Sequence, residues 1–203
     1  MRRASTYTRI NWLEKNCGNV PITPHTLNGK ISEMVRGGQA IQLANAKMLD
    51  AKVANFRVLN MYSAEHSNQL KDLRDTEKKA LHRIDEAAQS KDLRFRPSLV
   101  IPAIKLCSYA IGCALRPLGD SVSVSYIMGV KMAVSEYYND QIREIHSSCP
   151  DMVELKELFK QARDEEQSFV DAHTLDPNKH NQDPVAMFAK TTLKLLTQVA
   201  TAL

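Results

Sequence analysis

Three charged residues stand at positions where the helical pattern of the sequence calls for hydrophobic side chains. Glu77, Lys131 and Glu166 each fall on the apolar stripe, spaced by three and four residues, of a different helix-forming segment. Charged groups at core positions are unfavourable unless they pair with one another or bind a metal ion. In helical bundles, carboxylates from several helices that point at one centre hold a pair of iron ions. These residues are therefore the first candidates for chemistry.

The spacing required for two irons is specific, and the sequence lacks it. About four carboxylates are needed, and two of them must be followed three residues later by histidine so that both ligands share a helix face. At that spacing Ala80 follows Glu77 and Phe169 follows Glu166. A nearby lysine would also repel a metal ion. We therefore predict a buried ion cluster of Glu77, Lys131 and Glu166, with no catalytic residue, no metal and no cofactor. Exposure of one or more of them in a groove, and a metal site, stay open as alternatives.

The elements that carry these residues are helical throughout. Hydrophobic residues recur every three or four positions nearly to the C-terminus, and no segment has the alternation typical of a strand. With 7 glycines and 8 prolines in 203 residues, the chain has few turn residues for a β-sandwich or barrel. We predict an all-α bundle of about six helices. Their approximate ranges are 39–63, 67–90, 98–115, 121–147, 151–172 and 185–203.

The N-terminal segment differs from the rest of the chain. Prolines and glycines interrupt it, and residues 1–13 hold three arginines and no acidic residue. Such a segment is typical of a mitochondrial presequence or of a basic tail, and both interpretations stay open. We therefore divide the chain into an irregular basic arm, 1–38, and a helical bundle, 39–203. The net charge of +4 is too small to indicate a nucleic-acid partner.

A hydrophobic segment runs from residue 97 to residue 115 and contains Lys105. That charge makes it a poor transmembrane span, but the segment fits a helix that lies in a membrane interface. A surface for a protein partner and burial in the core are the alternatives. The residues of this predicted membrane or partner surface are Leu99, Val100, Ile101, Ile104, Leu106, Tyr109, Ile111 and Leu115.

Three short segments connect this chain to a known family. They are Arg96-Pro97-Ser98-Leu99-Val100-Ile101-Pro102, Tyr138-Asn139-Asp140-Gln141-Ile142-Arg143 and Arg163-Asp164-Glu165-Glu166. In their order, spacing and helical context, from about residue 40 onward, the chain resembles the demethoxyubiquinone hydroxylases, membrane-associated di-iron proteins of ubiquinone biosynthesis. The resemblance implies a ferritin-like bundle. It also implies that residues 97–119 dock on a membrane and lead to a quinone pocket.

The resemblance further implies where iron ligands would stand in this chain. The positions are Met48, Glu77, Ala80, Lys131, Glu166 and Phe169, and among them the glutamates alone are ligands that the family uses. We therefore interpret these positions as the remains of a di-iron site. Our hypothesis is that the Lys131 ammonium replaces part of the lost metal charge and pairs with both glutamates, while Met48 and Phe169 fill the emptied volume.

Because most of the implied iron ligands are missing, we expect a protein that is not an enzyme. We expect a metal-free accessory subunit of a mitochondrial inner-membrane assembly of the respiratory-complex or ATP-synthase type. It would lie on the matrix side of the membrane. Its partners would be protein subunits, with the membrane surface, a lipid or a quinone as further candidates. One alternative is a quinone- or lipid-binding accessory protein of ubiquinone biosynthesis without chemistry, and another is an active hydroxylase. An open cavity beneath residues 99–115 favours the quinone binder, and a filled cavity favours the accessory subunit.

Overall fold

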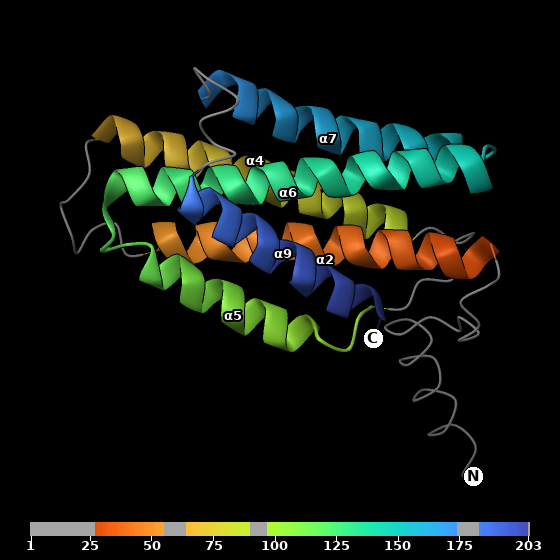
Figure 1. Cartoon of the computed structure of the whole chain (residues 1–203), viewed down its shortest axis with the longest axis horizontal. Coiled ribbons are helices and arrows are strands. Elements are labelled where there is room, and N and C mark those ends of the chain that lie inside the picture. The colour runs from red at the N-terminus through yellow and green to blue at the C-terminus, as the bar shows by residue number, and fades with distance from the viewer. Residues whose placement is uncertain (1–26, 55–63, 90–96, 174–182, 203) are drawn as a thin grey trace, which may run out of the picture.

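A computed structural model describes residues 27–54, 64–89, 97–173 and 183–202 and confirms the predicted all-α fold. No strand occurs in this part of the chain. The long helices run side by side along the molecule, as in a ferritin-like bundle (Figure 1). Over the described ranges the helices are α2 (Leu27–Val53), α4 (Ala64–Ala88), α5 (Ile101–Ala114), α6 (Gly119–Ser148), α7 (Val153–His173) and α9 (Pro184–Ala202).

Helix α2 occupies the middle of the bundle. It packs against α4, α5 and α9, while α6 packs against α7 and α9. In Figure 1, α7 lies at the upper edge of the bundle, α5 lies at the lower edge, and α9 crosses in front of α2. Met48 belongs to α2, Glu77 to α4, Lys131 to α6 and Glu166 to α7, so the candidate residues come from separate helices of one bundle.

Helix α2 begins earlier than the sequence indicated. We expected an irregular segment up to residue 38, which was wrong, because the helix starts at Leu27 and its first turns contribute to the core. Gly37 lies inside the helix, and Tyr137 of α6 packs directly on it, where a Cβ atom would overlap the Tyr137 hydroxyl. This tertiary contact overrides the low helix propensity of glycine. The predicted presequence falls on residues 1–26, outside the described residues, and stays a prediction.

The remaining helices begin and end within a few residues of their predicted bounds. The exception is the C-terminal end of α2, which is Val53 and not residue 63; residues 55–63 lie outside the described ranges. Most of the polar loop that we place at residues 176–184 also lies outside them.

The turn between α5 and α6 requires a glycine. Gly119 has a φ of 78°, a left-handed conformation that residues with a Cβ atom rarely adopt. Just before it, the Arg116 guanidinium donates hydrogen bonds to the carbonyl oxygen of Ala51 in α2. The turn and this contact together hold α5 against α2.

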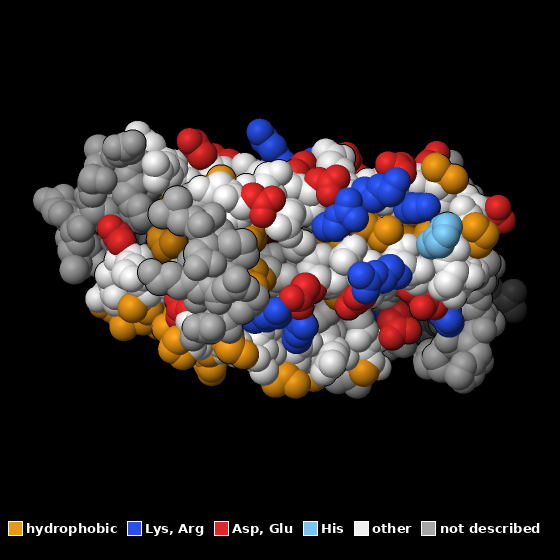
Figure 2. Space-filling model, turned by 45° about the horizontal axis from the view of Figure 1, so that its top comes forward, with side chains coloured by type: hydrophobic (Ala, Val, Ile, Leu, Met, Phe, Trp, Pro, Cys, Tyr) orange, Lys and Arg blue, Asp and Glu red, His pale blue; other side chains and the backbone are white. Residues whose placement is uncertain are grey.

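Charged and hydrophobic side chains occupy different parts of the surface. The face shown in Figure 2 carries acidic and basic side chains across its upper part, and hydrophobic side chains gather along its lower edge. None of the helices in the described ranges is both long and apolar enough to cross a membrane.

Candidate functional site

The three predicted charges meet in the core of the bundle. The Lys131 ammonium of α6 forms an ion pair with Glu77 Oε1 of α4, and its Nζ atom lies 2.7 Å from Glu166 Oε2 of α7. Each of the three residues exposes at most 2% of its surface. One ammonium thus bridges carboxylates on two other helices, and the alternative that these residues face solvent does not hold.

Two amides of α2 complete the cluster. Asn45 Nδ2 donates a hydrogen bond of 2.6 Å to Glu77 Oε2, and Gln42 Nε2 donates one of 3.4 Å to Glu166 Oε1. Glu77 therefore accepts hydrogen bonds from Lys131 at one oxygen and from Asn45 at the other. Glu166 accepts from Gln42 at Oε1 and is held to Lys131 by the ion pair at Oε2. A buried ion pair is tolerated when hydrogen bonds satisfy the remaining lone pairs of its members. We call these five residues the buried ion network; it joins α2, α4, α6 and α7.

Sequence reasoning missed the two amides. Gln42 and Asn45 are spaced by three residues and so share one face of α2. Both are almost completely buried. A signal was available in the spacing. Gln42, Asn45 and Met48 follow one another at intervals of three residues, which places both amides on the same helix face as the implied ligand position at Met48. A single asparagine or glutamine in a helical segment is usually exposed, and for that reason the pattern did not single them out.

The side chains at the implied ligand positions do not fit a pair of irons. Met48, Ala80 and Phe169 supply no carboxylate or imidazole, and the Lys131 ammonium lies between the two glutamates that remain. A metal ion placed there would face a fixed positive charge. Within the described residues, no group of three or more His, Cys, Asp or Glu side chains could hold a metal ion. The residues at this centre therefore do not fit a di-iron site.

A cleft of about 410 Å³ between α4 and α7 leads to the buried ion network. Ala80 and Phe169 line its walls, together with Lys131 and both glutamates. The Lys131 Nζ atom lies 5.3 Å from the centre of the Phe169 ring, a distance at which a cation is attracted to the ring face. Our hypothesis that Phe169 and Met48 fill the emptied volume therefore holds only in part, because this cleft stays open beside Ala80.

Helix α5 exposes only some of the residues that we assigned to a membrane or partner surface. Leu99, Leu106 and Tyr109 are exposed. Ile104 and Leu115 are each only 3% exposed, so their assignment to an outer surface was wrong: they point into the core. Val100, Ile101 and Ile111 are partly buried and pack against the core. One face of an amphipathic helix thus turns toward α2 and the other toward solvent.

Helix α9 adds exposed hydrophobic residues that we did not assign to a surface from the sequence. With those of α5 they define what we call the α5/α9 apolar surface, although the two helices are far apart in the sequence. Both helices pack on α2, and Ser108 of α5 and Leu196 of α9 line one common cavity. The members of this surface are Leu99, Leu106, Tyr109, Met187, Phe188, Leu195 and Val199.

The cavity beneath α5 is almost filled. It measures about 30 Å³, lies between α2, α5, α6 and α9, and is lined by Met48, Ile111 and Leu193 among other residues. That volume is close to the space taken by one water molecule. A quinone ring would not fit without movement of these side chains.

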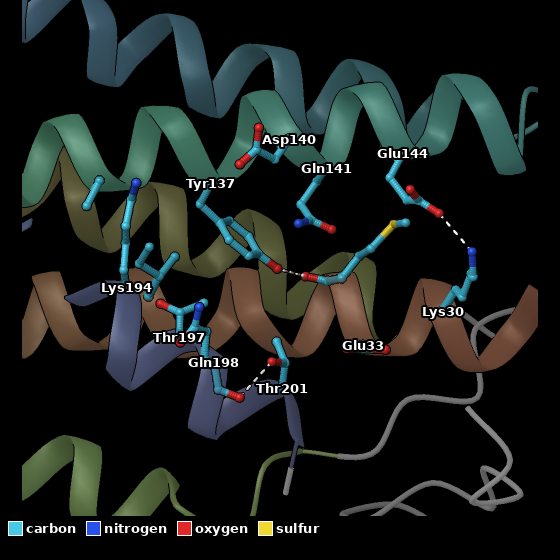
Figure 3. Close-up of a pocket in the computed structure, with 13 residues that line it drawn as sticks. Lys30, Glu33, Tyr137, Asp140, Gln141, Glu144, Lys194, Thr197, Gln198 and Thr201 are labelled. Atoms are coloured by element: carbon cyan, nitrogen blue, oxygen red, sulfur yellow. Dashed lines mark hydrogen bonds and ion pairs between the residues drawn. The ribbon is translucent and has the colours of Figure 1, made fainter. Parts of the chain in front are cut away.

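A further cavity, of about 520 Å³, lies between α2, α6 and α9 and was not predicted from the sequence. In Figure 3, Lys30 and Glu144 face each other at one end and form an ion pair of 2.8 Å. The Tyr137 hydroxyl donates a hydrogen bond of 2.7 Å to the Met34 carbonyl oxygen. Burial raises the pKa of Tyr137, so the phenol stays protonated. The cavity can hold a small polar molecule, but its lining residues do not pair a nucleophile with a base.

The fold and the buried ion network define an all-α bundle in which glutamates from neighbouring helices meet at one centre. The family described as ubiquinone biosynthesis protein COQ7 matches residues 30–203, and the chain therefore belongs to this family. The resemblance inferred from the sequence is confirmed.

The curated relatives share limited identity with the chain. A protein of Dictyostelium discoideum named "NADPH-dependent 3-demethoxyubiquinone 3-hydroxylase, mitochondrial" is 23% identical over 136 residues, which cover 67% of this chain and 59% of that protein. Proteins of the same name from Mus musculus and Homo sapiens are each 30% identical over 93 residues, which cover 45% of this chain and 42% of theirs. The match thus spans less than two thirds of the length of these relatives.

Family membership contradicts our expectation that this chain is not an enzyme. The relatives are named as hydroxylases, and the family is therefore one of enzymes. The substitutions at Met48, Ala80, Lys131 and Phe169 change which groups surround the centre of the bundle. By themselves they do not establish that the protein lacks activity.

Proposed function

We propose that this chain works in mitochondrial ubiquinone biosynthesis, at the demethoxyubiquinone step for which its relatives are named. In this proposal it lies on the matrix surface of the inner membrane, where the quinone-type lipid of that step resides. Family membership supports the pathway. The observation that carries the proposed location is the α5/α9 apolar surface.

The physical argument rests on the exposure of large hydrophobic side chains. Leu106 is 71% exposed and Phe188 is 66% exposed. Full burial of such a side chain is worth about 1.5–3 kcal/mol, so insertion of several into a membrane interface is favourable. Lys105 lies next to Leu106 and is itself exposed, where its ammonium can reach lipid headgroups. A quinone with a long apolar tail stays in the bilayer, so a protein that handles it must reach the membrane.

Flotation with vesicles tests the membrane contact. The full chain is mixed with vesicles of phosphatidylcholine and cardiolipin, with and without added ubiquinone. We expect the wild-type protein to float, and the double variant Leu106→Glu/Phe188→Glu to stay at the bottom of the gradient. Val153→Glu is the matched control, because Val153 is 60% exposed but lies on α7, away from α5. Failure of the wild-type protein to float, or flotation of the double variant, would remove the membrane proposal.

The pathway is tested separately by the quinones of cells that lack the protein. We expect ubiquinone to fall and its demethoxy precursor to accumulate. Re-expression of the wild-type chain should restore the profile, and the Leu106→Glu/Phe188→Glu variant should not. An unchanged quinone profile would contradict a role at this step.

A second candidate is an accessory role within a larger mitochondrial inner-membrane assembly of the respiratory-complex or ATP-synthase type. The filled cavity beneath α5 favours it, because a pocket of about 30 Å³ leaves no room for a quinone. Partner subunits would then cover the α5/α9 apolar surface. Native electrophoresis of mitochondria solubilised in mild detergent distinguishes the two candidates. Migration with a large complex supports the accessory role, and migration at low mass supports the first proposal.

A further inference from the structure

We infer that the Lys131 ammonium occupies the place that metal ions would take in this bundle, so that a built-in organic cation offsets part of the negative charge of the two glutamates and the centre is closed to metal. The inference concerns the buried ion network and does not depend on the proposed function, which rests on the α5/α9 apolar surface. It goes beyond family membership, because membership alone implies an iron site here.

The first argument is the geometry of the charges. Glu77 and Glu166 approach the centre from α4 and α7, and Lys131 reaches it from α6, so the ammonium contacts both carboxylates at once. All three side chains are almost completely buried, so the ion pairs are weakly screened by solvent. A metal ion could bind only by displacing this ammonium, which is covalently attached to the bundle and stays nearby as a repelling charge.

The second argument is that neighbouring residues are arranged for the lysine. Asn45 and Gln42 donate to the outer oxygens of the two glutamates, which leaves the other oxygens directed at Lys131. The Phe169 ring lies 5.3 Å from the Lys131 Nζ atom and adds an attraction for a cation. An imidazole or carboxylate at residue 169 would supply a metal ligand, whereas a phenyl ring supplies none.

The third argument is that the remaining positions lack donor atoms. Ala80 ends at a methyl group on the wall of the α4–α7 cleft. Met48 lines the small cavity beneath α5 together with Asn45 and offers only a thioether. Iron in carboxylate sites requires oxygen and imidazole ligands, and neither residue provides one.

A metal titration of the wild-type protein is the direct test. The full chain is dialysed against excess Fe(II) without oxygen, or against Mn(II), and the bound metal is measured after removal of the free ion. We expect far less than one metal ion per chain, and a thermal midpoint that neither the metal nor EDTA changes. Binding of about two irons per chain would overturn the inference.

A pair of designed variants isolates the contribution of Lys131. The variant Met48→Glu/Ala80→His/Lys131→Glu/Phe169→His restores the implied ligands, and we expect it to bind about two irons per chain. The matched variant Met48→Glu/Ala80→His/Phe169→His keeps Lys131, and we expect it to bind far less. Equal metal binding by the two variants would show that the ammonium does not close the site.

The thermal midpoint provides a readout that involves no metal. Lys131→Met leaves two buried carboxylates without their cation, and we expect the midpoint to fall by about 10 °C. Lys190→Met is the control, because Lys190 pairs with Glu136 in a partly exposed position and its loss should have little effect. If Lys131→Met does not fold, the neutral variant Glu77→Gln/Lys131→Met/Glu166→Gln should fold. An unchanged midpoint in Lys131→Met would overturn the inference.

Discussion

Gly112 of α5 lies directly against the main-chain carbonyl group of Met48 in α2, and a Cβ atom on residue 112 would overlap the Met48 oxygen. The same added atom would lie 2.7 Å from the Cβ atom of Ala51. This close approach sets the distance of α5 from α2. The helix that carries Leu106 and Tyr109 of the α5/α9 apolar surface is therefore held in place by a contact that only glycine permits.

Replacement of Gly112 by alanine should destabilise the protein. The overlap involves the backbone of α2, which no change of rotamer can relieve, and overpacking of this kind costs about 1–3 kcal/mol. Urea unfolding followed by circular dichroism measures the free energy of unfolding. Ala110→Ser, at an exposed position of the same helix, serves as the control and should stay within about 0.5 kcal/mol of the wild type. Equal stability of Gly112→Ala and the wild type would mean that α5 is not held at this distance.

Removal of the Asn45 amide should weaken the buried ion network. Asn45→Ala leaves Glu77 Oε2 buried without its hydrogen-bond donor, which costs about 1–3 kcal/mol of unfolding free energy. Gln42→Ala should cost less, because the hydrogen bond of Gln42 to Glu166 is long, at 3.4 Å. Denaturant unfolding of both variants gives the order. A larger loss in Gln42→Ala than in Asn45→Ala contradicts the geometry described above.

Lys52 should make the stability of the protein depend on pH. Burial lowers the pKa of Lys52 from 10.5 to about 8, opposed in part by Asp120. Its ammonium donates a hydrogen bond of 2.7 Å to Ser123 Oγ. Between these two pKa values the unfolded chain binds the proton and the folded chain does not, so stability rises with pH in that window.

The measurement for Lys52 is a difference between two proteins. The free energy of unfolding of the wild type, minus that of Lys52→Met, should increase from pH 7 to pH 9.5, because other titrating groups cancel in the difference. Lys194→Met, whose ammonium is exposed and pairs with Glu136, is the control and should show a smaller slope. A flat difference for Lys52→Met means that the folded protein does not lower the pKa of this lysine.

Arg83 should contribute to the alignment of α4 with α7. Its guanidinium donates two hydrogen bonds to the Glu165 carboxylate, one of them at 2.8 Å from Nη1 to Oε1. Lysine cannot form this paired contact, so Arg83→Lys should lower the free energy of unfolding by about 1 kcal/mol or less, given the partial exposure of both residues. The effect should diminish in 1 M salt. A loss that is the same at low and high salt would indicate that the pair acts through packing.

The helices and the three buried charges could be predicted because both follow from the spacing of residues within single segments of the sequence. A spacing of three and four residues identifies a helix and its buried face without knowledge of what the face contacts. Burial of an unpaired charge on such a face is unfavourable. Glu77, Lys131 and Glu166 could therefore each be identified as a candidate for a buried ion pair from its own segment alone. The position of residue 37 within α2 could not be predicted, since glycine disfavours a helix and only the contact with Tyr137 explains its presence there.

The sequence by itself determined that this protein is an all-α bundle of its family and that two glutamates and a lysine are buried within it. Only the tertiary structure decided which groups complete that centre and which residues form the surface. Gln42 and Asn45 of α2 reach Glu166 of α7 and Glu77 of α4 because the three helices meet around one centre. Ile104 points inward while Phe188 of α9 stays exposed. The hydrophobic pattern along one helix shows that a face is apolar, but what covers that face depends on helices that are distant in the sequence.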